Sequence, residues 1–187
     1  VLASRSGRVQ AGSEADWEWL TSVAAGATES IRTDVSDVSA VSAALRRVMS
    51  GSGQLAGVFH AAHMLADAML ANQTASNLRQ SYAPKVIGAQ GLHVATLCAP
   101  LTYFSIFSSI AGTVGSAAQA PHSATNTWVE AMAHWRRGFG MQSQSVAWGV
   151  VSEIGYAARF GVDRRADVGA ITRAEASDAL RQMLLAN

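Results

Sequence analysis

The stretch Leu55-Ala56-Gly57-Val58-Phe59-His60-Ala61-Ala62 decides the fold class of this chain. It is an apolar run of the length expected for a strand that is buried on both faces, as in a parallel sheet. The next apolar run, Leu101 to Phe107, is rich in aromatic and β-branched residues and also predicts a strand. Between them, Thr74 to about Leu97 has a helical pattern in which Pro84 predicts a bend or restart. Strand, helix and strand in this order predict one βαβ unit.

The same alternation continues toward both ends of the chain. Further strands are expected at Val1 to Ser4, Thr28 to Thr33 and Ser143 to Trp148, and a small-residue loop at Ser108 to Ala118. Helices are expected from Ser13, from Ser36 or Asp37 to Gly51-Ser52-Gly53, from Ala120 to Arg137, and from Thr172, where Glu175 completes a capping-box pattern. Residues 1–187 therefore predict a single α/β domain, a parallel sheet with helices on both faces. The connection at 149–170 is long for this fold and is a candidate substrate lid.

Composition narrows the function classes. The chain has 14 Lys+Arg against 13 Asp+Glu and is only 14% charged, which argues against disorder, a nucleic-acid-binding arm and an acidic tail. Its one cysteine, Cys98, excludes an intramolecular disulfide and a cysteine-based zinc cluster, so a reducing, cytoplasmic setting is expected. The chain begins at Val1 without a signal peptide, and we expect it to be a piece of a larger polypeptide.

One long uncharged stretch raises the alternative of a membrane span. No Asp, Glu, Lys or Arg occurs between Lys85 and Glu130, and Gly91 to Gly115 is largely apolar. However, Pro100 interrupts that segment, several Ser and Thr side chains would need partners in lipid, and no cluster of basic residues flanks it. We therefore expect burial inside the protein and no contact with a membrane.

Polar residues gather where the predicted strands end. Ligands of open parallel sheets bind outside the carboxyl ends of the strands, so the residues just after each strand are candidate site residues. Here these residues are Ser4-Arg5, Asp34-Val35, His60-Ala61-Ala62-His63, Ser108-Ser109 and Trp148-Gly149.

Several motifs, in order, resemble the ketoreductase domain of modular polyketide synthases, a Rossmann-like domain of the short-chain dehydrogenase/reductase type. Their separations along the chain also agree with that family. The segments that carry the resemblance are Gly57 to Ala62, Leu65-Ala66-Asp67, Ala83-Pro84-Lys85-Val86, Phe107-Ser108-Ser109-Ile110-Ala111-Gly112, Gly115 to Ala120, and Ala124-Thr125-Asn126. Together they cover nearly the whole chain.

The resemblance implies a function and a set of site residues. It implies NADPH-dependent reduction of a β-ketoacyl chain on an acyl carrier protein, with neighbouring synthase domains as further partners. The implied catalytic positions are Lys85, Ser109, His122 and Asn126. Ser4 and Arg5 would face the 2′-phosphate of NADPH, Asp34 and Val35 its adenine, and His60, Ala61 and Ala62 would also line the cofactor site. Asp67 and Trp148 would lie beside the substrate.

Two departures from the family matter most, changed residues at the site and an absent element. His122 stands where the family has its catalytic Tyr, and His63 stands where the family has Gly. The first strand and the glycine-rich loop of a doubly wound sheet do not precede Val1. The segment Gly51 to Ala56 has the glycine spacing of a phosphate-binding loop, but it follows a helix instead of a strand, so it is rejected as one. A positioned general acid contributes about 100- to 10,000-fold in rate, so the reductase is expected to be impaired.

Other interpretations of these residues remain. Lys85 alone would be a surface lysine, Arg5 a solvated turn charge and Asp34 a helix-entry residue. His60 and His63 have the spacing of metal ligands, but no third ligand follows, so no metal is expected. A catalytically inactive, ketoreductase-like structural domain of a megasynthase is the alternative function, and a stand-alone reductase is a third.

Overall fold

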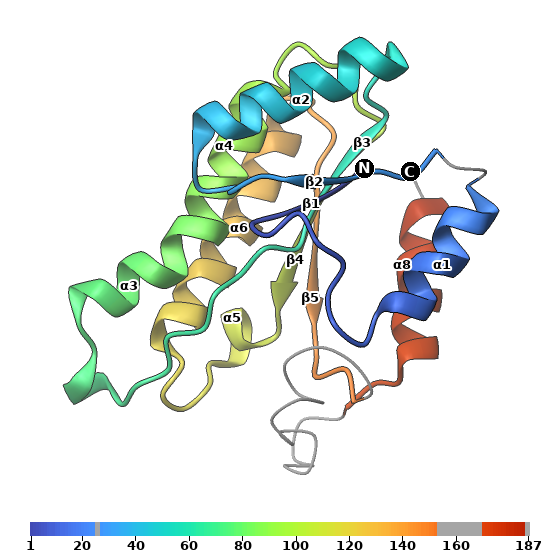
Figure 1. The fold of residues 1–187 in the computed structure, drawn as a ribbon. Helices are drawn as coiled ribbons and strands as arrows, with labels where there is room; N and C mark the ends of the chain where they lie inside the picture. Colours follow the sequence, from blue (N-terminus) through green and yellow to red (C-terminus); the bar gives the residue numbers. More distant parts are fainter. Residues whose placement is uncertain (25–26, 153–169, 186–187) are drawn as a thin grey trace.

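The computed structural model describes residues 1–24, 27–152 and 170–185, and it has the alternating order of strands and helices expected from the sequence (Figure 1). The elements are β1 (Leu2–Ser4), α1 (Glu14–Val23), β2 (Ser30–Arg32), α2 (Val38–Ser52), β3 (Gly57–His60), η1 (Leu70–Asn72), α3 (Ala75–Tyr82), η2 (Ala83–Ile87), α4 (Gly88–Ala95), β4 (Tyr103–Ser109), α5 (Ala111–Val114), α6 (Ala120–Gly138), β5 (Gln144–Trp148) and α8 (Arg173–Leu185).

All named strands pair in parallel, but they form two groups. In one group β1 pairs with β2, and in the other the order is β3-β4-β5. The sequence predicted one sheet without its first strand. In the usual order of a doubly wound sheet, the first strand lies between the second and the fourth. The resemblance matches β1 to the second strand and β3 to the fourth, so the break falls where the first strand would pair with both.

Helices cover both faces of the larger group of strands, as predicted. In Figure 1, α3, α4 and α6 lie on one side of β4 and β5, and α1 and α8 lie on the other. An exposed ion pair of 2.6 Å between Arg173 and Asp16 joins α8 to α1.

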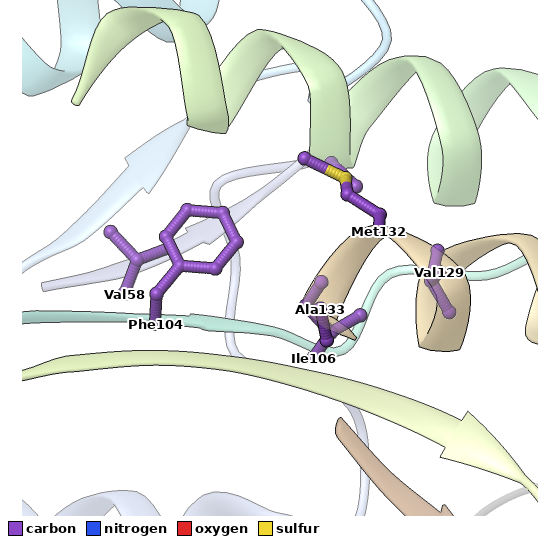
Figure 2. Close-up of a cluster of buried hydrophobic side chains, with 7 residues drawn as sticks. Val58, Phe104, Ile106, Val129, Met132 and Ala133 are labelled. Atoms are coloured by element: carbon purple, nitrogen blue, oxygen red, sulfur yellow. The ribbon is translucent and has the colours of Figure 1, made fainter. Parts of the chain in front are cut away.

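The hydrophobic core sits between the larger sheet and its helices (Figure 2). Phe104 and Ile106 of β4 are 1% and 0% exposed. They face α6, whose apolar residues repeat at helical spacing. The cluster comprises Val58, Ala89, Phe104, Ile106, Val129, Met132 and Ala133. The uncharged stretch singled out as a possible membrane span thus supplies the centre of the core, and within the described ranges no helix is both long and apolar enough to cross a bilayer.

The helix signals in the sequence have physical counterparts. Asp37 accepts hydrogen bonds from the backbone N–H groups of Ser39 and Ala40 and caps α2, which ends at Gly53 with a positive φ of 77°. Thr172 and Glu175 form the expected reciprocal capping box, with contacts of 2.7 and 3.2 Å. Near Pro84 the chain does not simply bend. Residues Ala83–Ile87 form a π-helix between α3 and α4, and such π-helical turns occur often at functional sites.

Two local predictions from the sequence are corrected by the structure, and a third concerns residues that the structure does not describe. The predicted loop Ser108 to Ala118 contains the short helix α5, and Ser109 is the last residue of β4. Ser13 precedes α1 without a side-chain capping bond. Most of the candidate lid, residues 153–169, lies outside the described residues; at its margins Val151 and Ile171 form an isolated parallel bridge.

Candidate active site

Lys85 and Asn126 lie at the centre of the site. Lys85 belongs to the π-helix η2, and only 4% of its surface is exposed. Asn126 belongs to α6 and is 0% exposed. Lys85 Nζ donates a hydrogen bond of 2.5 Å to Asn126 Oδ1. The fold therefore joins two buried polar residues that are far apart along the chain.

This hydrogen bond fixes the orientation of the Asn126 amide. An ammonium group has only donors, so Asn126 turns its oxygen toward Lys85 and its nitrogen away from it. Asn126 Nδ2 donates to the backbone oxygen of His122 at 2.7 Å and lies 3.2 Å from His122 Nε2. Because an amide nitrogen can only donate, His122 Nε2 accepts, and the proton of the ring is assigned to Nδ1.

The same neighbours keep His122 uncharged. Burial, the positive charge of Lys85 and the nearby His63 together lower the pKa of His122 from 6.5 to about 4, although the charge of Asp67 acts in the opposite direction. A charged ring would also turn a second N–H against Asn126 Nδ2. His122 is therefore a neutral imidazole at pH 7. His122, which the sequence predicts to replace the family's Tyr, therefore offers the weakly acidic N–H of a neutral ring and not the stronger acid of an imidazolium.

Lys85 carries a positive charge at pH 7, although its pKa is lowered toward neutral pH. Burial lowers the pKa of Lys85 from 10.5 to about 8, and the negative charge of Glu130 opposes this shift. The ammonium form therefore predominates at neutral pH, and Lys85 remains a hydrogen-bond donor to Asn126.

Ser109 lies beside this network without a hydrogen bond to it among the described residues. It ends β4, and its hydroxyl accepts a hydrogen bond of 3.2 Å from the backbone N–H of Ala111. Gly112 carries α5 close to α6, since a Cβ on Gly112 would lie 3.1 Å from Asn126 Cβ and from the backbone nitrogen of Thr127. The link from Ser109 to α6 therefore runs through α5.

The segment that follows β3 closes one side of the site. Asp67 accepts a hydrogen bond of 2.9 Å from the side chain of Gln119, and the backbone N–H of Ala68 donates to Ala118 at 2.9 Å. The rings of His63 and His122 meet edge to face with centroids 6.4 Å apart. In the described part of the chain, no three His, Cys, Asp or Glu residues gather in a group that could hold a metal ion.

Trp148 borders the site from β5. It pairs in register with Ser109, and its ring lies 5.6 Å from that of Phe107, measured between centroids. Its buried Nε1 has no hydrogen-bond acceptor among the described residues. Trp148 thus holds an unused donor on the strand next to Ser109.

The predicted adenosine end of the cofactor site lies on the other group of strands. Arg5 is exposed after β1. The pKa of Asp34 is lowered mainly by a hydrogen bond from the Ser36 hydroxyl, then by the Ser36 backbone N–H, and to a smaller extent by the positive charge of Arg5. Asp34 Oδ1 accepts from the hydroxyl and the backbone N–H of Ser36 at 2.6 and 2.9 Å. Ser4 accepts from the backbone N–H of Gly7 at 3.0 Å. Asp34 and Ser4 therefore shape their own turns, whereas Arg5 projects as an exposed guanidinium.

His60 and Val35 meet at the start of α4. A Cβ on Gly88 would lie 3.0 Å from His60 Cε1 and 3.0 Å from both methyl groups of Val35. His60 Nε2 donates to the backbone oxygen of Lys85 at 3.0 Å, and burial lowers the pKa of His60. His60 therefore supports the π-helix that carries Lys85. The next residues, Ala61 and Ala62, are exposed and half-buried.

Two residues of the site, Gly88 and Glu130, did not stand out in the sequence, and Gly112 was noted only as the end of the motif that begins at Phe107. Gly88 and Gly112 provide close approaches that only the packing reveals. Glu130 accepts a hydrogen bond of 2.5 Å from the hydroxyl of Ser108. Its position four residues after Asn126, on the same face of α6, was the signal that could have identified it.

Known proteins share this fold and these motifs. The sequence model of the family described as "KR domain" matches residues 1–153. Phthioceranic/hydroxyphthioceranic acid synthase of Mycobacterium tuberculosis is 48% identical over 99 residues, 53% of this chain and 5% of that protein. A hybrid PKS-NRPS synthetase of Aspergillus violaceofuscus is 37% identical over 159 residues, 84% of this chain and 4% of that protein. The chain therefore spans a small fraction of the curated relatives that it matches.

Solved ketoreductase structures agree over almost the whole chain. An A1-type ketoreductase superposes with a TM-score of 0.88 at 31% identity, covering 98% of this chain and 39% of that one. A ketoreductase domain from the bacillaene assembly line superposes with a TM-score of 0.84 at 26% identity, covering 99% of this chain and 46% of that one. The parallel α/β fold and the resemblance seen in the sequence are both confirmed. This chain belongs to the KR family, the ketoreductase domains of polyketide synthases.

Proposed function

We propose that this domain reduces a β-ketoacyl chain carried by an acyl carrier protein, with NADPH as the hydride donor, at a rate lowered by His122. The observation that carries the proposal is the buried hydrogen bond from Lys85 Nζ to Asn126 Oδ1. A buried, charged lysine is costly unless its hydrogen bonds and charge are compensated, so its retention beside the strand ends favours a role in chemistry. As part of the proposal, the domain works beside neighbouring synthase domains in a reducing cytoplasm.

When bound, NADPH would supply the hydride that the keto carbon accepts in the proposed reaction. The carbonyl oxygen gains the negative charge and then takes up a proton, which gives the alcohol. Ser109, at the end of β4, would donate a hydrogen bond to this oxygen, and Trp148, which pairs in register with Ser109, would lie beside the substrate. The charge of Lys85 would stabilise the developing alkoxide through Asn126 and His122. Proton donation falls to His122, whose neutral ring is a poor acid.

The described residues fit the adenosine end of NADPH. The exposed guanidinium of Arg5 can fork onto a ribose phosphate, and the two methyl groups of Val35 provide an apolar edge. A cavity of about 270 Å³ between β1 and α1 is lined by Ser4, Leu2 and Trp17 but by none of the catalytic positions. It therefore plays no part in the proposed chemistry.

One observation favours a second function, that of a catalytically inactive structural domain. The Asn126 amide holds His122 Nε2 as an acceptor, and the pKa of His122 is about 4, so the ring carries no proton that it readily gives up at pH 7. Such a domain would keep Lys85 and Asn126 as packing and hydrogen-bonding partners without turnover.

Nucleotide binding and turnover distinguish the two functions. We suggest a longer chain that also carries a strand and a glycine-rich turn ahead of Val1, titrated with NADPH and NADH by nucleotide fluorescence. NADPH oxidation is then followed with a carrier-free β-ketoacyl thioester. Slow oxidation that disappears in Asn126→Ala supports the reductase. Binding of NADPH without its oxidation supports the inactive domain only if Lys85→Met leaves the affinity for NADPH unchanged. Absence of nucleotide binding contradicts the reductase.

A further inference from the structure

Lys85 is buried without a direct ion pair in the described part of the chain. The ion pairs found there, Arg47 with Glu29, Arg173 with Asp16 and Arg181 with Asp178, are all exposed. The ammonium of Lys85 instead bonds to the neutral amide of Asn126. A buried charge of this kind requires compensation from its surroundings.

Glu130 is in the right place to provide this compensation. It lies one turn after Asn126 on α6, so both side chains project from the same face of the helix. Ser108, which is 5% exposed, donates its hydroxyl proton to Glu130 Oε1 at 2.5 Å. The same hydroxyl oxygen is 3.4 Å from the backbone oxygen of Asn126, but a hydroxyl has one proton, and the shorter contact to the carboxylate takes it.

We infer that Glu130 is a positioning residue of the site, a counter-charge that Ser108 holds in place and that keeps Lys85 charged and directed at Asn126. The inference rests on geometry at three residues of β4 and α6 and extends the proposed function to a residue outside the catalytic set. The charge of Glu130 also opposes the effect of burial on the pKa of Lys85.

Loss of the counter-charge has a defined effect on the network. A neutral lysine amine can accept a hydrogen bond, so it no longer forces the Asn126 oxygen to face it. The Asn126 side-chain amide could then rotate by half a turn and present its oxygen to His122. His122 Nε2 would no longer be required to act as a hydrogen-bond acceptor. Glu130 therefore acts on His122 through Lys85 and Asn126, without contact with a substrate.

The sequence makes this inference directly measurable, since Lys85 is the only lysine of the chain. With lysine labelled with ¹³C at Cε, an NMR titration shows a single lysine signal and requires neither nucleotide nor substrate. In Glu130→Gln, which keeps the size and the hydrogen-bonding oxygen, we expect the pKa of Lys85 to fall by about one unit. Glu18→Gln removes an exposed carboxylate on α1 and should leave the pKa of Lys85 unchanged.

The outcomes decide between a counter-charge and a merely structural glutamate. An unchanged pKa of Lys85 in a folded Glu130→Gln chain overturns the inference, as does an equal fall in Glu18→Gln. If Glu130→Gln does not fold, Glu130→Asp replaces it, because its carboxylate is withdrawn by one methylene and should give a smaller fall in the same direction. No fall in Glu130→Asp would then overturn the inference. None of these results depends on reductase turnover, so the proposed function can fail separately.

Discussion

Asn126 Nδ2 lies 3.2 Å from His122 Nε2, and this contact makes a hydrogen-bond acceptor of the ring nitrogen that faces Asn126. The direction of the contact follows from the bond that Asn126 accepts from Lys85. His122, the predicted counterpart of the family's proton donor, is thus held in a state that does not donate through Nε2.

The first prediction concerns turnover. Replacing His122 by Tyr supplies a phenol that can protonate the alkoxide, so His122→Tyr should raise NADPH oxidation by about 100-fold or more in the longer chain described above. His122→Gln, which adds no acid, should bring no gain. Pro121 fixes the backbone just before this position and can displace the new ring. A native rate typical of reductases, or a decrease in His122→Tyr, would show that His122 is a working acid.

The second prediction concerns stability in acid. The folded-state pKa of His122 lies below its unfolded value, so the unfolded chain binds more protons between pH 6.5 and 4, and stability falls as the pH falls through that range. With allowance for partial solvent exposure, we expect His122 to account for about 1 kcal/mol of the loss between pH 7 and 5. Urea unfolding at both pH values measures it. His122→Gln should lose less stability than the native chain, and an equal loss would contradict the assignment.

The third prediction concerns nucleotide choice. Arg5 is exposed after β1, where a guanidinium can contact the 2′-phosphate that NADPH has and NADH lacks. Arg5→Ala should narrow the preference for NADPH by about 1.5–3 kcal/mol, the range for a hydrogen bond to a charged group. Fluorescence titration of both nucleotides checks it, with Arg8→Ala as the matched control. If Arg5→Ala leaves the affinities for NADPH and for NADH unchanged, Arg5 does not contact the nucleotide.

The fourth prediction concerns the approach of α4 to β3. A methyl group on Gly88 would lie 3.0 Å from His60 and Val35, so Gly88→Ala should destabilise the fold by about 1–3 kcal/mol through overpacking. Gly51→Ala is the matched control, because that helical glycine has open space around it and should gain about 0.5–1 kcal/mol. Urea unfolding of both variants gives the comparison. A Gly88→Ala chain as stable as the native one would show that His60 can move freely.

Sequence patterns predicted the larger features of the fold because those features depend on local chemistry. The run at Val58 and Phe59, the capping box at Thr172 and the stop at Gly53 each act within a few residues. The short helix α5 was missed because its four residues are too few to show a helical period, and the hydrogen bond of 2.8 Å from the Thr127 hydroxyl to the Gly112 backbone oxygen joins it to α6 over a long sequence distance. The separation of β1 from β3 likewise depends on long-range pairing.

In the candidate site, too, the sequence predicted some features, whereas others depend on contacts between distant parts of the chain. Motif order identified Lys85 and Asn126, and the structure joins them by a hydrogen bond. The sequence also suggested that Lys85 would disfavour a charged His122, and the lowered pKa of His122 agrees in direction. Which nitrogen of His122 carries the proton, and which carboxylate balances Lys85, depend on distances across α6 and β4 that spacing alone does not give.

The break between the two groups of strands has a consequence for how the domain would respond to a nucleotide. Arg5 lies on one group and Lys85 packs against the other, so each part of the proposed cofactor site belongs to a separately hydrogen-bonded body. A dinucleotide that contacts both groups of strands would hold them together. Its binding free energy would then slow the amide hydrogen exchange of the less stable group. Amide hydrogens of β1 and β2 would exchange fastest in the free domain and slow most when the nucleotide binds.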